Sequence, residues 1–139
     1  MTNEKLIEQA KIARKNAYAV ISGFKVGAAL LTKNGKVFRG SNIEDPSGIG
    51  ITNICAERCA LVKAVSEGYL EYEKIAVVGG PFGITGKDDT LIFCAPCGAC
   101  RQYLNSWCPK IKVILLENNG EIKEYSIAEL LPYSFNEKF

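Results

Sequence analysis

Two short apolar runs, each preceded by a helical segment, most constrain the fold of this chain. Residues 75–78 (Ile-Ala-Val-Val) and 112–116 (Lys-Val-Ile-Leu-Leu) have the length and hydrophobicity of buried strands. Helical patterns precede them, over about 56–67 and from Pro96 towards Cys108. Strands that are joined through helices run parallel, with right-handed crossovers. The chain is therefore predicted to have an α/β fold.

Further strands and helices are predicted on either side of these two runs. Asn34-Gly35 lies between two strand-like runs and predicts a hairpin, because both turn positions need a positive φ. Ser126-Ile-Ala-Glu129 is a capping box that opens a short last helix. The predicted strands span 26–31, 37–41, 75–78, 112–116 and 122–125, and the helices 3–17, 56–67, 97–108 and 126–132. The sequence thus predicts one mixed five-stranded sheet with helices on both faces.

The composition indicates one globular domain covering residues 1–139, with 47% apolar and 23% charged residues. A net charge of +2 without a basic run argues against nucleic acid or a membrane surface as a partner, and favours a small polar substrate. The first residues lack the layout of a signal peptide, and no apolar run is long enough to span a bilayer. We therefore expect a cytoplasmic protein.

Cysteine is the residue type that carries chemistry in this chain, which contains no histidine. In the cytoplasm the six cysteines are expected to be thiols or metal ligands, not disulfides. Cys59 and Cys108 are interpreted as small core residues, whereas no role is assigned to Cys94. The remaining three lie in the segments Cys55-Ala-Glu57 and Pro96-Cys97-Gly-Ala-Cys100.

These two segments together predict a catalytic zinc site. Each lies at the start of a predicted helix, where free N–H groups and the positive helix end stabilise a thiolate. If the two helix starts meet, Cys55, Cys97 and Cys100 supply three ligands and leave one position of a tetrahedral zinc open, as in catalytic sites. Glu57 can then face that position and carry protons. Cysteine, glutamate and Pro-Cys-x-x-Cys in this arrangement are the pattern of zinc-dependent base deaminases, with Cys55 in place of histidine.

Two other interpretations of the cysteines remain open at this point. The Cys-x-x-Cys can be a thiol redox pair, or part of a structural zinc site closed by Cys59 or Cys94. Neither of these requires a glutamate two residues after a cysteine, so both are disfavoured. Zinc with three thiolates carries a formal charge of −1, and we expect Arg58 to offset it through hydrogen bonds to the ligand sulfurs.

The chain resembles the small, homotetrameric-type cytidine deaminases over nearly its whole length. The zinc segments alone indicate only the wider deaminase superfamily, whereas Asn42-x-Glu44 is specific to the nucleoside branch. The matching stretches are Phe24-Lys-Val-Gly-Ala-Ala-Leu30, Gly40-Ser-Asn42-Ile-Glu44, Cys55-Ala-Glu57-Arg58, Pro96-Cys97-Gly-Ala-Cys100-Arg101-Gln102 and Glu129-Leu-Leu-Pro132. The resemblance implies a three-layer α/β/α deaminase fold and a homotetramer.

The resemblance also implies an activity, which is the zinc-dependent hydrolytic deamination of cytidine and 2′-deoxycytidine, with release of ammonia. Cys55, Cys97 and Cys100 would bind Zn²⁺, and Glu57 would protonate N3 and then the departing amine. The substrate contacts that it implies are stacking by Phe24, ribose hydroxyl binding by Asn42 and Glu44, reading of the base edge by the N–H of Ala56, and completion of a neighbouring subunit's site by Phe135.

Two segments near the expected pocket depart from the family pattern. Val20-Ile21-Ser22-Gly23 replaces the common Pro-Tyr-Ser, and the loop over 45–54 is about two residues longer than usual and lacks a tyrosine. Two alternatives therefore stay open. One is the same reaction on a modified cytosine nucleoside of the blasticidin type, and the other is a non-catalytic zinc-binding module.

Overall fold

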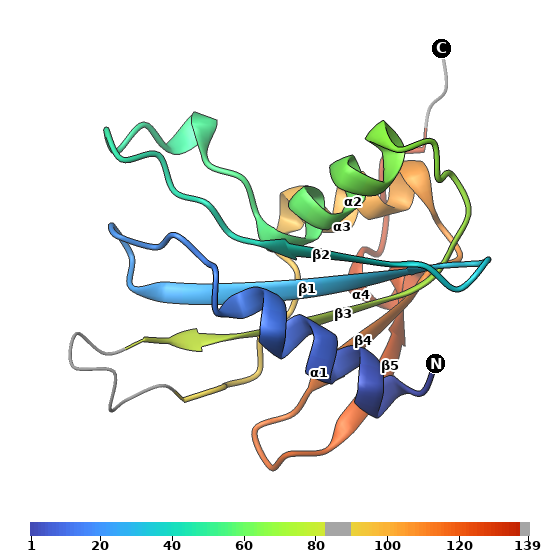
Figure 1. Ribbon diagram of the computed structural model, residues 1–139. Coiled ribbons are helices and arrows are strands. Elements are labelled where there is room, and N and C mark those ends of the chain that lie inside the picture. Colours follow the sequence, from blue (N-terminus) through green and yellow to red (C-terminus); the bar gives the residue numbers. More distant parts are fainter. Residues whose placement is uncertain (83–89, 137–139) are drawn as a thin grey trace.

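The computed structural model describes residues 1–82 and 90–136, which form a sheet with helices on both faces (Figure 1). The helices are α1 (Asn3–Arg14), α2 (Ala56–Ser66), α3 (Gly98–Trp107) and α4 (Ile127–Leu130), with a short 3-10 helix at Gly50–Thr52. The strands are β1 (Phe24–Thr32), β2 (Val37–Ser41), β3 (Tyr72–Pro81), β4 (Lys112–Leu116) and β5 (Ile122–Ser126). The predicted mixed five-stranded sheet is confirmed, and its strand order is β2-β1-β3-β4-β5.

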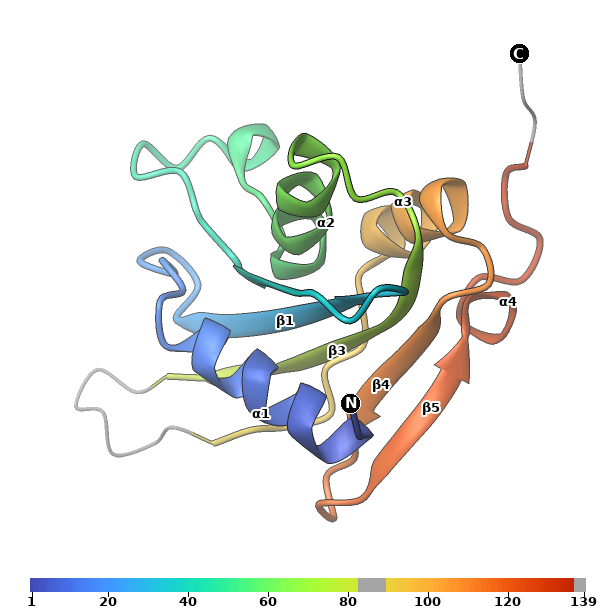
Figure 2. The same ribbon diagram turned by 45° about the vertical axis from the view of Figure 1, so that its right-hand side comes forward.

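The sheet is mixed because the chain forms a hairpin at each end, β1 with β2 and β4 with β5, and passes through the helices α2 and α3 between them. The strand β1 is antiparallel to both β2 and β3, and β4 is antiparallel to β5. The strands β3 and β4, which are joined through α3, are parallel as predicted. Figures 1 and 2 show α1 on one face of the sheet and α2 with α3 on the other. The segment that leads into α3 lies beside the carboxyl end of β3, where the Ile92 amide donates to the Gly79 carbonyl oxygen.

Successive residues of the central strands point to opposite faces of the sheet and are buried on both. In β1, Ala28 and Leu30 pack with residues of α2 and α3 such as Leu61 and Leu104. Ala29 and Leu31 of the same strand pack against α1. A strand covered on both faces needs apolar residues at every position, which explains the continuous runs in the sequence.

The predicted end of the first helix and both predicted ends of the third strand were wrong, and the last helix, predicted to reach residue 132, ends at Leu130. The helix α1 ends at Arg14 instead of residue 17. The chain turns away there because the Tyr18 amide donates to the Asn42 carbonyl oxygen (2.9 Å), beyond β2. The strand β3 is much longer than 75–78, and Gly79, Gly80 and Pro81, which were assigned to a loop over 79–90, belong to it. Residues 83–89 of that predicted loop lie outside the described residues.

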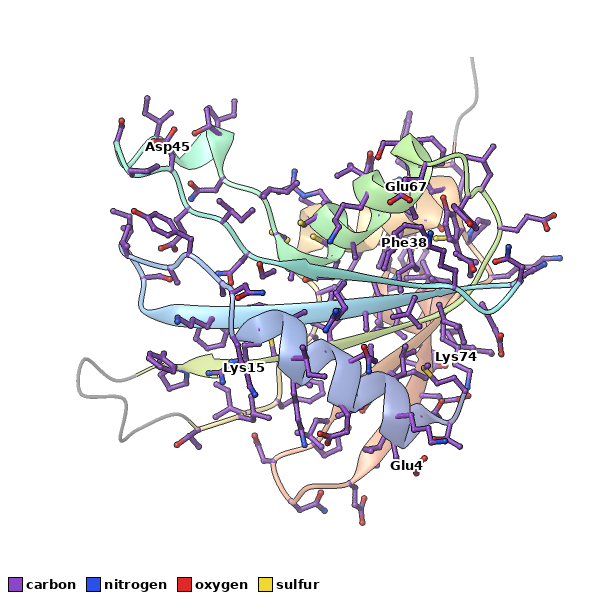
Figure 3. The ribbon with its side chains drawn as sticks, viewed as in Figure 1. Glu4, Lys15, Phe38, Asp45, Glu67 and Lys74 are labelled. Carbon is purple, nitrogen blue, oxygen red and sulfur yellow. The ribbon has the colours of Figure 1, made fainter. Side chains whose placement is uncertain are left out.

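The start of α2 is fixed against the sheet by a backbone contact at Gly40 in β2. A Cβ atom on Gly40 would lie 2.4 Å from the Ala56 carbonyl oxygen and 2.4 Å from the Ala60 nitrogen. No other residue type leaves room for this approach. Phe38, which precedes Gly40 by two residues on β2, is buried between that strand and the helices above it (Figure 3). The first turn of α2 is thereby held at a defined height over β2.

Candidate active site

Three cysteine sulfurs meet where α2 and α3 begin. Cys55 and Cys97 are the N-cap residues of the two helices, and Cys100 is buried in the first turn of α3. The three Sγ atoms lie within 4.8 Å of one another, and those of Cys55 and Cys97 are 3.7 Å apart. Zn–S bonds of about 2.3 Å in a tetrahedron place sulfurs about 3.8 Å apart. The predicted convergence of the two helix starts is therefore present, and its spacing suits zinc.

The other cysteines lie outside this cluster. Within residues 1–82 and 90–136 the only metal-type cluster contains neither Cys59 nor Cys94, so the structure gives no support to a fourth thiolate. Cys108 is buried in the core, as predicted. The prediction was wrong for Cys59, which is half-buried and belongs to neither core cluster. Burial raises the pKa of Cys94 to about 12, which leaves its thiol neutral at physiological pH.

Arg58 is the cation next to the sulfur cluster. Its Nη2 atom lies 3.6 Å from Cys55 Sγ, and its buried Nε atom has no hydrogen-bond partner among the described residues. Hydrogen bonds from Cys100 and Arg58 hold the pKa of Cys55 well below its usual range. The guanidinium thus favours the thiolate form that a metal requires.

Glu57 is a buried acid beside the cluster. It lies in the first turn of α2, and only 4% of its surface is exposed. Burial raises its pKa to about 7, because the ionised form loses its hydration. A carboxyl group in this environment can both hold and give up a proton near neutral pH.

A cavity of about 290 Å³ opens beside the cysteines and Glu57. Its volume suits a ligand no larger than a single nucleoside. It brings together seven of the predicted site residues, namely Phe24, Asn42, Glu44, Cys55, Ala56, Glu57 and Cys97. Of the other three, Cys100 is in the metal-type cluster and Arg58 contacts that cluster through Cys55 Sγ. Phe135 does not line the cavity of its own chain.

The two polar residues beyond β2 have structural contacts that sequence reasoning missed. Asn42 Nδ2 donates to the Phe24 carbonyl oxygen (2.8 Å), and Asn42 Oδ1 accepts from the Val26 amide (2.8 Å). This two-point contact holds the start of β1, and with it the ring of Phe24. Glu44 Oε1 accepts from the amides of Ile21 and Ser22, 2.9 and 3.1 Å away. Each side chain keeps hydrogen-bonding capacity on its other positions.

The unusual loop over 45–54 is organised by Asp45. Asp45 Oδ1 accepts from the Ser47 amide (2.6 Å), its other oxygen accepts from Thr52 Oγ1, and its own amide donates to Asn53 Oδ1 (2.6 Å). Figure 3 shows Asp45 in the projecting part of this loop, away from the sheet. Asn53 and Ile54, at its end, line the cavity. The contact between Asp45 and Asn53 therefore links the projecting loop to the pocket wall.

Sequence reasoning also missed Val26, Cys94 and Ala95, which complete the cavity wall. Val26 lies in the matched stretch that begins at Phe24, and the alternation along a strand could have placed it on the same face as Phe24. The sequence offered Cys94 only as a candidate fourth thiolate of a structural zinc site, and nothing in the local pattern distinguishes Ala95 from ordinary loop residues.

The C-terminal segment is held on α3. Gln102 Nε2 donates to the Phe135 carbonyl oxygen (2.8 Å), and the Phe135 amide donates to Gln102 Oε1 (3.2 Å). Asn105 adds a hydrogen bond to Asn136 (2.8 Å). The side chain of Phe135 is 59% exposed. The helix that begins with two of the sulfur ligands therefore also positions Phe135.

The donor set identifies the class of protein. Three thiolates beside a buried carboxyl group, on the starts of two helices that cover one face of a mixed sheet, are the metal centre of a zinc-dependent deaminase. The chain belongs to the cytidine and deoxycytidylate deaminase family, since the model of that family's zinc-binding region matches residues 1–116. Zinc as the cofactor and the deaminase fold, both predicted from the sequence, are thereby confirmed.

Known proteins with the same architecture support this assignment. The chain is 47% identical over 136 residues to a cytidine deaminase of Halalkalibacterium halodurans, covering 97% of this chain and 95% of the relative. The crystal structure of a cytidine deaminase from Burkholderia pseudomallei matches with a TM-score of 0.82 and 45% identity, over 97% and 100% of the two chains. A blasticidin-S deaminase of Bacillus cereus is 34% identical over 110 residues, 79% of this chain and 76% of the relative. In the described part of the chain, no helix has the length and apolar character to cross a bilayer.

Proposed function

We propose that this protein catalyses the hydrolytic deamination of cytidine and 2′-deoxycytidine to uridine and 2′-deoxyuridine, with release of ammonia. The observation that carries the proposal is the placement of three sulfurs and the buried Glu57 on one nucleoside-sized cavity. Membership of the deaminase family and the cytidine deaminases among its relatives support it.

Cys55, Cys97 and Cys100 would hold Zn²⁺, which supplies Lewis-acid activation of a water molecule. Glu57 would take one proton from the water molecule and deliver it to the ring nitrogen N3, and would then take the second proton, from the hydroxyl group added at C4, and deliver it to the amine, which leaves as ammonia. Its position two residues after Cys55 in the chain and its place on the cavity wall support this role. Arg58, 3.6 Å from Cys55 Sγ, would offset the formal charge of −1 on the metal centre.

The other cavity residues would bind and orient the nucleoside. Phe24, which Asn42 holds in place, would stack on the base, and the backbone N–H of Ala56 would read its edge. The remaining amide hydrogen of Asn42 and the second carboxylate oxygen of Glu44 would bind ribose hydroxyls. Among residues 1–82 and 90–136, neither a lysine nor an arginine lines the cavity. Because a phosphate group needs such cations, this lining favours a nucleoside over a nucleotide.

We further propose a homotetramer in which Phe135 completes a neighbouring subunit's site, and a cytoplasmic location. The exposed side chain of Phe135, held on α3 by Gln102, supports the first proposal. The six cysteines are free in the structure, and the metal centre requires reduced thiolates, which a reducing compartment maintains. Sedimentation analysis and mixed-subunit complementation, with Phe135→Ala in one protomer and Glu57→Gln in another, test the tetramer.

The activity is tested by following the loss of cytosine absorbance with cytidine, 2′-deoxycytidine, cytidine monophosphate and blasticidin S. We expect turnover of the two nucleosides and at most traces with the others. Glu57→Gln should retain one zinc per chain and lose at least 10²-fold in kcat, as expected for a general acid–base group. Deamination of blasticidin S without cytidine would overturn the substrate assignment. Zinc binding without turnover of any of these compounds would identify a non-catalytic module instead.

A further inference from the structure

One wall of the cavity is formed by a side chain that the proposed reaction does not use. Cys94 lies on the extended segment that leads into α3 and lines the cavity. This segment lies beside the end of β3, where the Ile92 amide donates to the Gly79 carbonyl oxygen (3.0 Å). Gly79 therefore lies next to the wall of the cavity, on the strand behind it.

Gly79 is required for space and not for its backbone conformation. Its φ angle lies outside the left-handed region. A Cβ atom built on Gly79 would lie 2.6 Å from Cys94 Sγ, 3.1 Å from Cys94 Cβ and 3.1 Å from Phe24 Cε1. The thiol and the ring of Phe24 therefore both fill the space that a side chain at position 79 would take.

We infer that Gly79 and Cys94 are a matched pair that sets the width of the cavity next to Phe24, and that Cys94 thereby determines which cytosine bases fit. This inference rests on the proposed function. The sulfur lies back against β3 only because Gly79 has no side chain. A methyl group at position 79 forces Sγ away from the strand, towards the cavity and the stacking face of Phe24. Conversely, removal of the sulfur relieves the shortest of the three contacts and leaves only the two at 3.1 Å.

The test is a double-mutant cycle with four proteins: wild type, Gly79→Ala, Cys94→Ala and the double variant. The measurements are zinc content, kcat and KM for cytidine, and kcat/KM for cytidines that carry one methyl group on C5 or C6 of the base. Cys59→Ala is the matched control, because Cys59 is half-buried outside both the cavity and the metal-type cluster.

Gly79→Ala should keep one zinc per chain and raise the KM for cytidine at least tenfold, with a smaller change in kcat. The double variant should recover at least fivefold of that increase in KM, because the 2.6 Å contact with Sγ is then gone and only the two contacts at 3.1 Å remain. Cys94→Ala should raise the relative kcat/KM for at least one methylated base at least fivefold, and Cys59→Ala should behave as wild type. Non-additivity of this kind is expected only for residues in contact.

The inference is overturned if the double variant is no better than Gly79→Ala, or if Gly79→Ala binds cytidine like the wild type. Should Gly79→Ala fail to fold, Cys94→Val decides the matter, since its extra bulk must raise KM and lower tolerance of methylated bases. If the wild type does not deaminate cytidine at all, the proposed function has failed on its own. The affinity of the same four proteins for uridine is then measured by calorimetry. If the effects of the substitutions at positions 79 and 94 on that affinity are additive, the inference is refuted.

Discussion

Gly40→Ala is expected to damage the active site although Gly40 does not line the cavity. The added Cβ would lie 2.4 Å from two backbone atoms, the Ala56 oxygen and the Ala60 nitrogen. Backbone atoms inside a helix cannot rotate away, so α2 as a whole must move. Restoring a normal contact of about 3.4 Å requires a displacement of roughly 1 Å. Such overpacking typically costs about 1–3 kcal/mol.

The displacement reaches the chemistry because Cys55 and Glu57 lie on the part of α2 that moves. A misplacement of about 1 Å at reacting groups can cost roughly 10²-fold in rate. We therefore expect Gly40→Ala to lower kcat for cytidine about 10²-fold and to weaken zinc retention. For a chain of this size, a loss of about 2 kcal/mol corresponds to a fall in Tm of roughly 6–8 °C.

The assay combines calorimetric melting, zinc content by atomic absorption and kcat for cytidine. Gly50→Ala is the control, because a Cβ at Gly50 meets nothing within 4 Å and Gly50 does not line the cavity. It should match the wild type in all three measurements. If Gly40→Ala also keeps full zinc, the wild-type Tm and a kcat within twofold of the wild type, then the contact between β2 and α2 does not set the site, and the reasoning fails.

Three further predictions concern residues around the cavity. Arg58→Gln should weaken zinc affinity or slow turnover by roughly 10–100-fold, as measured by chelator competition and by kcat; unchanged values for both would refute its electrostatic role. Asn42→Leu leaves the Phe24 carbonyl and the Val26 amide unpaired, so we expect the KM for cytidine to rise at least tenfold and Tm to fall. Hydrogen bonds from Ser22, and the amide of Ile21, hold the pKa of Glu44 below its usual value of 4.5, so this carboxylate stabilises the fold above pH 4.5 and less as the pH falls through its lowered pKa. The difference in Tm between wild type and Glu44→Gln should accordingly shrink below pH 4.5, and a gap that does not change with pH would contradict the assignment.

The sequence predicted those parts of the fold that depend on local pattern. The hairpin around Asn34-Gly35, the buried strand 112–116 and the capping box at Ser126 are present at the predicted positions. The expected turn geometry was wrong in one respect, because Gly35 has a positive φ (91°) and Asn34 does not. These three features could be predicted because the turn geometry, the apolar run and the cap each depend on neighbours in the chain. The end of β3 was missed for the opposite reason. Gly79 and Gly80 look like loop residues, but their small size serves contacts with distant segments.

The metal ligands and Glu57 were predicted because their roles depend on short spacings along the chain. Cys55 and Cys97 could be predicted as metal ligands because each lies at the start of a predicted helix. Glu57 could be placed beside them because it follows Cys55 by two residues. The contact of Asn42 with the backbone of β1 and the position of Cys94 against Gly79 join residues that lie more than fourteen positions apart. No short-range pattern encodes such pairings, so these contacts in the pocket wall could not be predicted from the sequence.

The contact between α3 and the C-terminal segment has a practical consequence for handling this protein. The helix that begins with Cys97 and Cys100 also carries Gln102, whose amide is bound to the backbone of Phe135. If metal binding stabilises this helix, thermodynamic linkage requires an ordered tail to strengthen metal binding by the same factor. In that case, an affinity tag or surface attachment at the C-terminus that displaces the segment around Phe135 is expected to weaken metal binding, whereas one at the N-terminus, which precedes α1, is expected to leave it unchanged.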